Sequence, residues 1–179
     1  MQKIVILLLF LTMLSCSENS ELESSGTSIN KNDQITSETS SQSIILNKTS
    51  DNSEIKFPEK ALVGTDAEKE FLATGKNIYV GDAEAIKTGK KRYNLWSCTQ
   101  CHGPTAKGQV GPGLTGPKYN YAKDATNKGM FETIWGGTNG GMGAKGFGLM
   151  APDDGVTVDE LLKIIAFVRS NGKGLTGNE

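Results

Sequence analysis

The sequence predicts an all-α domain with long ordered loops. Two Thr-x-x-Glu capping boxes, beginning at Thr65 and Thr157, each precede a stretch whose apolar residues recur with helical spacing. No segment shows the strict alternation of apolar and polar residues that is typical of a strand. Residues 103–127 and 136–156 are rich in Gly and Pro, which favours loops between the helices.

Composition excludes several classes of protein. The 179 residues suit one modest domain, and the net charge of −1 lacks the basic excess of a nucleic-acid binder. The longest apolar run, Ile4–Leu11, is far shorter than the roughly 18–20 residues of a membrane-spanning helix. A site built on several histidines is excluded as well, because His102 is the only His.

Residues 1–16 predict an export signal. Lys3 precedes the apolar run, and Ser15 is a small residue of the kind that precedes a cleavage site. Cys16, directly after Ser15, resembles the acylated Cys of a bacterial lipoprotein signal, whose lipid would anchor the chain to a membrane. Two alternatives stay open: plain secretion, with Cys16 removed together with the signal, and a disulfide formed by Cys16.

Residues 17–55 predict a disordered polar linker. Ser, Thr and Asn supply 20 of the 39 residues, and the net charge is −5, so the segment cannot bury enough apolar surface to offset its ordering entropy. The apolar cluster Ile44–Leu46 interrupts it, but three residues are too few to predict structure. The folded domain is expected at 56–179, where 16 basic and 13 acidic residues give a net charge of +3.

Within that domain the first helix is expected over residues 65–74, with Gly75 in the left-handed stop position. A second helix is expected from about residue 82 to 97. Gly89 in its middle costs about 1 kcal/mol relative to Ala, which implies a packing reason for the glycine.

The third expected helix begins at the Thr157 capping box and stops at Gly172. Its apolar stripe consists of Leu161, Ile164, Ile165 and Val168. A short helical turn is also expected over Met130–Trp135.

The motif Cys98-Thr-Gln-Cys101-His102 predicts the covalent attachment of one c-type haem. Two thiols three positions apart can each add to one vinyl group of a porphyrin, and the next residue places an imidazole at the iron. Three alternatives stay open for this motif. A structural zinc needs four ligands, a thioredoxin-like pair needs a βαβ context, and a simple disulfide needs only an oxidising compartment.

Opposite His102, the iron needs a second ligand, and no second His exists. Outside the signal, three Met residues remain. Met130 begins an apolar helical turn and is expected in the core. Met142 lies in a run of glycines, which lets the backbone approach a porphyrin closely, and Met150 before Ala-Pro is the competing candidate.

The proximal His normally donates its other ring N–H to an acceptor that fixes the ring. The carbonyl of Pro112, in Gly-Pro-Gly-Leu, lies at a plausible distance along the chain, although the same residues also fit an ordinary turn. Residues expected to line the haem pocket, or simply to belong to the core, are Tyr93, Trp96, Leu114, Trp135 and Leu161.

The sequence resembles the class I cytochromes c. The resemblance rests on Gly89–Tyr93 before the Cys-x-x-Cys-His motif, on Gly111–Leu114, on the late Met and on the C-terminal amphipathic helix. The segments Phe71–Gly75, Gly129–Gly137 and Asn139–Gly143 are similar to the cytochrome c-L family in particular, and the resemblance covers about residues 65–172.

The resemblance implies the class I cytochrome c fold, with loop-rich helices wrapped around one covalent haem c. It implies thioether bonds at Cys98 and Cys101, axial ligands His102 and Met142, and the Pro112 carbonyl as the acceptor. It also implies a periplasmic one-electron carrier, not an enzyme. Such a carrier accepts electrons from a pyrroloquinoline-quinone-dependent alcohol dehydrogenase, of the methanol type, and passes them to a downstream cytochrome or oxidase.

Two departures from the family concern the electron donor: the acylated linker, and the insert Ala144–Asp153, which is longer than in the methylamine-linked members. The alternative function is a cytochrome c subunit of a larger respiratory or dehydrogenase complex. A small peroxidase and a haem-free zinc module are further rivals. The basic cluster Lys90–Arg92 could steer an acidic partner, or could simply be a solvated helix face.

Overall fold

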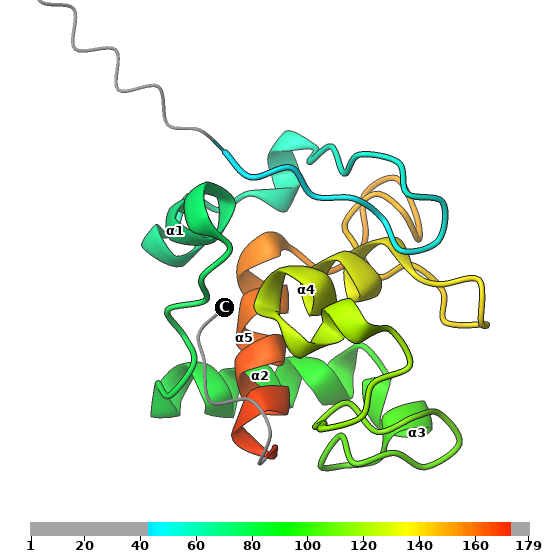
Figure 1. Ribbon diagram of the computed structural model, residues 1–179. Helices are drawn as coiled ribbons and strands as arrows, with labels where there is room; N and C mark the ends of the chain where they lie inside the picture. Colours follow the sequence, from blue (N-terminus) through cyan, green and yellow to red (C-terminus); the bar gives the residue numbers. More distant parts are fainter. Residues whose placement is uncertain (1–42, 173–179) are drawn as a thin grey trace, which may run out of the picture. The chain divides into compact units, whose positions relative to one another are not determined.

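The computed structural model describes residues 43–172, which fold as helices joined by long loops (Figure 1). The predicted signal, Cys16 and the linker up to residue 42 lie outside the described residues. The described elements are η1 Glu59–Ala61, α1 Asp66–Thr74, α2 Ala83–Leu95, α3 Cys98–His102, η2 Ala122–Ala125, α4 Asn127–Gly136 and α5 Val158–Ser170. Over residues 43–172 β-pairing is limited to three isolated bridges, so the all-α prediction is confirmed.

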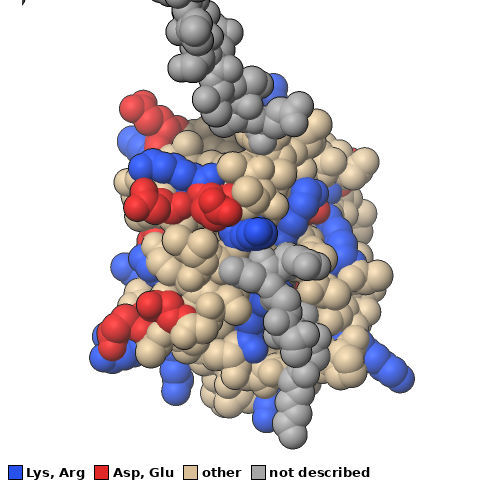
Figure 2. Space-filling model, turned by 60° about the vertical axis from the view of Figure 1, so that its left-hand side comes forward, with Lys and Arg blue, Asp and Glu red and all other residues tan. Residues whose placement is uncertain are grey.

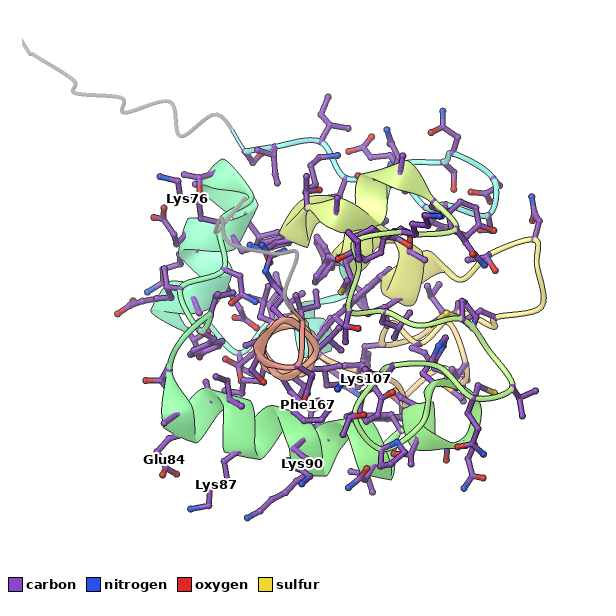
Figure 3. All side chains as sticks on the ribbon, turned by 60° about the horizontal axis from the view of Figure 1, so that its bottom comes forward. Lys76, Glu84, Lys87, Lys90, Lys107 and Phe167 are labelled. Atoms are coloured by element: carbon purple, nitrogen blue, oxygen red, sulfur yellow. The ribbon has the colours of Figure 1, made fainter. Side chains whose placement is uncertain are left out.

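The centre of the fold is the crossing of α2 and α5, which Figure 3 shows with α5 seen along its axis. A Cβ added at Gly89 of α2 would lie 1.9 Å from the backbone oxygen of Lys163 in α5. Phe167 lies between the helices, its ring 5.2 Å from that of Tyr93, whereas Lys87 and Lys90 point away from α5. Gly89, for which the sequence predicted a packing reason, is therefore the residue at which the backbones of α2 and α5 meet.

Two helix starts agree with the sequence prediction. Thr65 and Thr157 both accept a hydrogen bond from the backbone three residues on, and each capping box is complete. Gly75 ends α1 in the left-handed conformation, with φ of 81°. The end of α5 differs slightly from the prediction, because the C-cap is Asn171 and not Gly172. A Cβ added at Gly172 would lie 2.6 Å from the carbonyl oxygen of Thr115, so glycine at this position leaves room for that carbonyl.

The helix expected over 82–97 is α2, which ends two residues earlier, at Leu95. Ser97 then takes a left-handed φ of 59°, and the separate short helix α3 begins at Cys98. The turn expected over Met130–Trp135 belongs to a longer helix, α4, because Thr126 caps it by accepting a hydrogen bond from Gly129 N.

The linker prediction was wrong for residues 43–55, which we call the N-terminal strap. Leu46 and Ile55 are 3% and 5% exposed, and Ile55 N donates to Leu46 O at 2.8 Å. Asn47 N donates to the buried carboxylate of Glu132 in α4 at 2.9 Å, and Thr49 bonds Thr133. Two features therefore order the strap against α4. One is the apolar cluster Ile44–Leu46, and the other is the buried carboxylate of Glu132, which needs hydrogen-bond donors.

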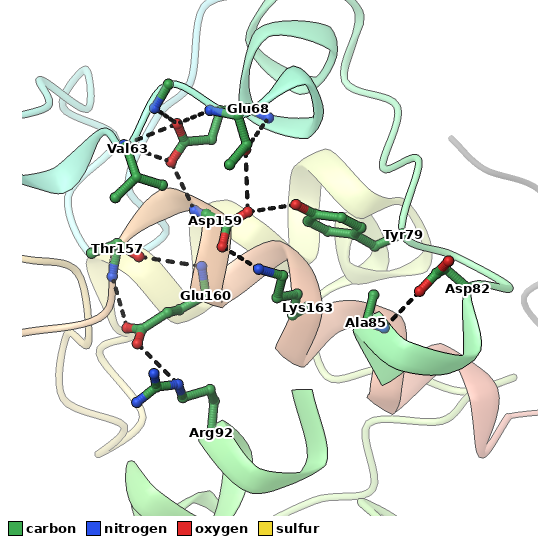
Figure 4. Close-up of polar contacts among 12 residues, drawn as sticks. Val63, Glu68, Tyr79, Asp82, Ala85, Arg92, Thr157, Asp159, Glu160 and Lys163 are labelled. Carbon is green, nitrogen blue, oxygen red and sulfur yellow. Dashed lines mark hydrogen bonds and ion pairs between the residues drawn. The ribbon is translucent and has the colours of Figure 1, made fainter. Parts of the chain in front are cut away.

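A polar network joins α1, α5 and the preceding loop (Figure 4). The carboxylate of Glu68, 2% exposed, accepts from the backbone N–H groups of Val63, Gly64 and Asp159. Asp159 in turn accepts from the Tyr79 hydroxyl at 2.6 Å. Each buried carboxylate thus receives several donors, which is what its burial requires.

No helix among residues 43–172 has both the length and the apolar character needed to cross a membrane.

Candidate haem site

The site is built on α3 and the loop that follows it. His102 is 7% exposed, and its Nδ1 lies 2.8 Å from the carbonyl oxygen of Pro112. Gly111 N donates to Cys101 O at 2.7 Å, which holds the loop under the imidazole. With Nδ1 engaged by a carbonyl, the ring nitrogen that remains for a metal is Nε2.

Two cavities adjoin this histidine. The larger, of about 390 Å³, is lined by Cys98, Cys101, Val110 and Lys145 among others. The smaller, of about 100 Å³, is lined by Leu114, Tyr119, Asp124 and Thr133 among others. Both are also lined by His102, Pro112, Gly140 and Met142. Cys98, Cys101, His102 and Met142 therefore all line the larger cavity.

The three candidate methionines occupy different environments. Met142 is half-buried and lines both cavities, and its carbonyl accepts from Thr138 N at 2.8 Å. Met150 is 51% exposed and lines neither cavity. Met130 is 2% exposed in the core, where the sequence placed it. Only Met142 shares a cavity wall with His102.

The other expected pocket residues do not all reach the cavities. Leu114 lines the smaller one, but Tyr93, Trp96, Trp135 and Leu161 line neither. The Tyr93 hydroxyl donates to Gly103 O at 3.0 Å, and Trp135 stacks with Phe131 at 5.4 Å. Tyr93, Trp135 and Leu161 are nearly fully buried. They belong to the core, which is the second of the two environments that the sequence predicted for them.

The lining residues that the sequence analysis missed include Tyr119, Tyr121, Asp124 and Thr133. Asp124 accepts from the Thr133 hydroxyl at 2.6 Å, and burial raises the pKa of its carboxyl above the usual range. The Tyr119 hydroxyl is buried without a hydrogen-bond partner among the described residues. No spacing signal marks these positions, because they come from a loop, from η2 and from α4.

Burial also affects the thiol that faces the larger cavity. It raises the pKa of Cys98 to about 11, an effect that the nearby charge of Lys145 partly opposes. Cys98 and Cys101 are both free, and neither forms a disulfide. At neutral pH the Cys98 thiol beside the larger cavity is therefore protonated.

These residues fit a covalently attached haem. The thiols and His102 come from one short helix, Met142 lines the same two cavities as His102, and the unpartnered Tyr119 hydroxyl supplies a donor for a polar group in the smaller cavity. No cluster of three or more His, Cys, Asp or Glu side chains within residues 43–172 could hold a metal ion. The fold and this site define a class I c-type cytochrome.

Comparisons with known proteins agree. The family model for cytochrome c matches residues 86–172. A cytochrome c-L from Methylorubrum extorquens is 39% identical over 105 residues, which are 59% of this chain and 49% of that protein. The chain thus aligns with about half the length of that curated relative.

Two solved structures are also similar. Cytochrome cL from the marine methylotrophic bacterium Methylophaga aminisulfidivorans is 38% identical, with a TM-score of 0.60, over 71% of this chain and 79% of that one. Cytochrome cL from Hyphomicrobium denitrificans is 36% identical, with a TM-score of 0.61, over 71% of this chain and 73% of that one. The chain belongs to the cytochrome c family, on its cytochrome c-L branch. Its cofactor is one covalently bound haem c.

Proposed function

We propose that the protein is a one-electron carrier whose haem iron is held between His102 and Met142, with thioether bonds at Cys98 and Cys101. The observation that supports this assignment is that His102 and Met142 line both cavities, whereas the rival Met150 is half exposed and lines neither. When bound, haem c supplies a one-electron couple. With two axial side chains in place, no coordination position is left for a substrate, so the chain acts as a carrier and not as an enzyme.

The surrounding residues have separate roles in this proposal. The Pro112 carbonyl, 2.8 Å from Nδ1, orients the His102 ring and increases its donor strength. The thioether of Met142 raises the reduction potential relative to a nitrogen ligand. Leu114 and the half-buried Met142, which line the smaller cavity, would shield a bound haem from water.

The proposed electron donor is a pyrroloquinoline-quinone-dependent alcohol dehydrogenase of the methanol type, and the acceptor is a downstream cytochrome or oxidase. Support comes from the relatives, which are cytochromes c-L, one of them from a methylotrophic bacterium. The length of the insert Ala144–Asp153 also favours an alcohol dehydrogenase, because it exceeds that of the methylamine-linked members that the sequence resembles.

We further propose a periplasmic location, with residues 1–16 as a signal peptide and a lipid on Cys16 as a membrane anchor. Support comes from the sequence alone: the basic start, the apolar run and the Ser15-Cys16 pair. Mass spectrometry of the mature N-terminus distinguishes an acylated Cys16 from cleavage beyond it.

The test of the proposed function is rapid mixing of the oxidised, haem-loaded protein with a pyrroloquinoline-quinone methanol dehydrogenase. Methanol-dependent reduction within the turnover time of the dehydrogenase is expected, and omission of methanol should abolish it. Reduction by ascorbate serves as the control for a competent haem. A protein that ascorbate reduces but the dehydrogenase does not would contradict the proposed donor.

A further inference from the structure

We propose that the N-terminal strap positions the loop that carries Met142, through a hydrogen bond between Ser50 and Asn139. We call residues 138–143 the Met142 loop. This inference rests on the proposed function, in which Met142 binds the iron, and it adds positioning residues that lie outside the cavities. Neither Ser50 nor Asn139 lines either cavity, so both act on Met142 through the loop.

The Met142 loop is hydrogen-bonded mainly to itself. Thr138 N donates to Met142 O at 2.8 Å, and Gly140 N donates to the Thr138 hydroxyl at 3.2 Å. Among the hydrogen bonds of the described residues, a single one joins the loop to another part of the chain, and in it Asn139 Nδ2 donates to Ser50 O at 2.7 Å. Since Met142 is only half-buried, this bond is an important restraint on the position of its loop.

The strap places Ser50 at the end of α4. Lys48 N donates to Ser53 O at 2.9 Å, which closes a turn around Ser50. The Ser50 hydroxyl donates to the carbonyl of Gly136, the last residue of α4, at 3.0 Å. A Cβ added at Gly136 would lie 2.6 Å from Lys48 Cβ, so glycine there lets the strap approach the helix. Figure 1 shows the strap, in cyan, passing across α4.

A second contact joins the same turn to a wall of the smaller cavity. The hydroxyls of Thr49 and Thr133 lie 2.8 Å apart, and Thr133 donates to Asp124 at 2.6 Å. Because the Thr133 proton is engaged by Asp124, the Thr49 hydroxyl is the donor to Thr133. Thr133 and Asp124 line the smaller cavity together with Met142. The strap turn therefore contacts both a lining helix and the loop that carries the proposed ligand.

These contacts between the strap turn and the haem site are uncharged. Figure 2 shows charged side chains of both signs on the face that it draws. The Met142 loop, in contrast, contains no charged residue, and neither Thr49 nor Ser50 is charged. Neutral hydrogen bonds are not screened by salt as ion pairs are, so the restraint on the loop should not weaken as ionic strength rises.

The test measures how readily the loop releases the iron. Imidazole is titrated into the full-length, haem-loaded ferric protein, and loss of the charge-transfer band of the Met-ligated haem is followed. Imidazole replaces the thioether, so one Fe–S bond breaks and one Fe–N bond forms without a change in oxidation state. The affinity for imidazole then reports the free energy of opening the loop, and the rate at saturating imidazole reports the rate of opening.

Two variants should loosen the loop. Ser50→Ala removes the bond to the end of α4, and Asn139→Ala removes the bond from the loop to the strap. Each should raise the imidazole affinity and the limiting rate by roughly two- to fivefold, the low end for a lost hydrogen bond because Asn139 is exposed. The increase should be the same at high ionic strength.

Ser53→Ala is the matched control, because it makes the same change in the same turn. The Ser53 hydroxyl donates to Asp51 within the turn, so imidazole binding should not change. The double variant of Ser50→Ala with Asn139→Ala should show less than the product of the two single effects, because both act on one contact. A full product, or a lower urea midpoint with an unchanged limiting rate and unchanged amide exchange in the loop, would overturn the proposal.

Amide hydrogen exchange at Thr138 gives a second readout that does not depend on which side chain binds the iron. The Thr138 amide donates within the loop, so its exchange should be faster in Ser50→Ala and in Asn139→Ala. Faster exchange with unchanged imidazole affinity would support the role of the strap and contradict Met142 as the ligand. Unchanged exchange together with unchanged imidazole affinity would overturn the role of the strap.

Discussion

The α2–α5 crossing and the haem cavity are held together by different kinds of contact. At the crossing, Gly89 meets the Lys163 backbone and the apolar stripe of α5 is fully buried. Around the cavity, loops are fixed by single hydrogen bonds, such as His102 to Pro112 and Thr138 to Met142. Variants of the crossing should therefore change stability without changing the iron ligands, and variants of the cavity should do the opposite.

The largest expected effect is that of Gly89→Ala. The added Cβ would overlap the Lys163 carbonyl, and a backbone atom cannot move aside without separating the helices. We expect a loss of about 3 kcal/mol or more in the free energy of unfolding, although Ala favours helix. Urea unfolding of the haem-loaded protein measures it. Thr88→Ala, in the same helix, is the control, and an unchanged midpoint for Gly89→Ala would break the account of the crossing.

The next effect concerns the N-terminal strap, which belongs to the stabilising region. Leu46→Ala removes a side chain that is 3% exposed, whereas its neighbour Ile45 is 67% exposed. We expect Leu46→Ala to cost about 2–3 kcal/mol and Ile45→Ala to cost under about 0.5 kcal/mol. Equal unfolding midpoints for the two variants would mean that the strap does not pack in solution.

The strap also makes an acid-sensitive contact. Burial raises the pKa of Glu132, but hydrogen bonds from Lys123 and Lys128 outweigh it, and the net shift is downward. A lowered folded pKa means that the stabilisation is present above the unfolded value of about 4.3 and is lost as pH falls through the folded pKa. Glu132→Gln should therefore lower stability at pH 7 by about 1–2 kcal/mol, and the difference from wild type should shrink toward pH 3. A difference that is constant with pH would contradict this.

The smallest effect lies on the surface of the crossing. Arg92 pairs with Glu160 at 3.1 Å, but its side chain is 42% exposed, so the ion pair is screened by solvent. We expect Arg92→Gln to cost under about 1 kcal/mol and to have less effect still in 0.5 M salt. A loss comparable with that of Leu46→Ala would show that this pair has a larger role at the crossing than its exposure suggests.

The same difference explains what the sequence could predict. Capping boxes and the stripe of α5 are local signals, so the helices at the crossing were predicted nearly to the residue. The Cys-x-x-Cys-His motif placed three cavity residues because all three lie on one short helix. Part of the smaller cavity could not be predicted, because Tyr119, Asp124 and Thr133 come from a loop, from η2 and from α4 and carry no local signal.

The N-terminal strap shows a further limit of prediction from sequence. Its composition is that of a disordered segment, but contacts such as those of Leu46 with the core and of Asn47 with Glu132 order it. Asn47 and Glu132 are 85 positions apart in the sequence, so composition does not reveal their contact. The folded domain therefore includes residues 43–55, whereas the sequence predicted that it begins at residue 56.

The most direct test of the central claim compares Met142→Leu with Met150→Leu in the haem-loaded protein. The account predicts that Met142→Leu abolishes the charge-transfer band of a Met-ligated ferric haem and lowers the reduction potential by on the order of 0.2 V, part of the ~0.8 V over which axial ligands act. Met150→Leu, at a position 51% exposed, should leave both unchanged. Loss of the band in Met150→Leu, with the band retained in Met142→Leu, would contradict the account.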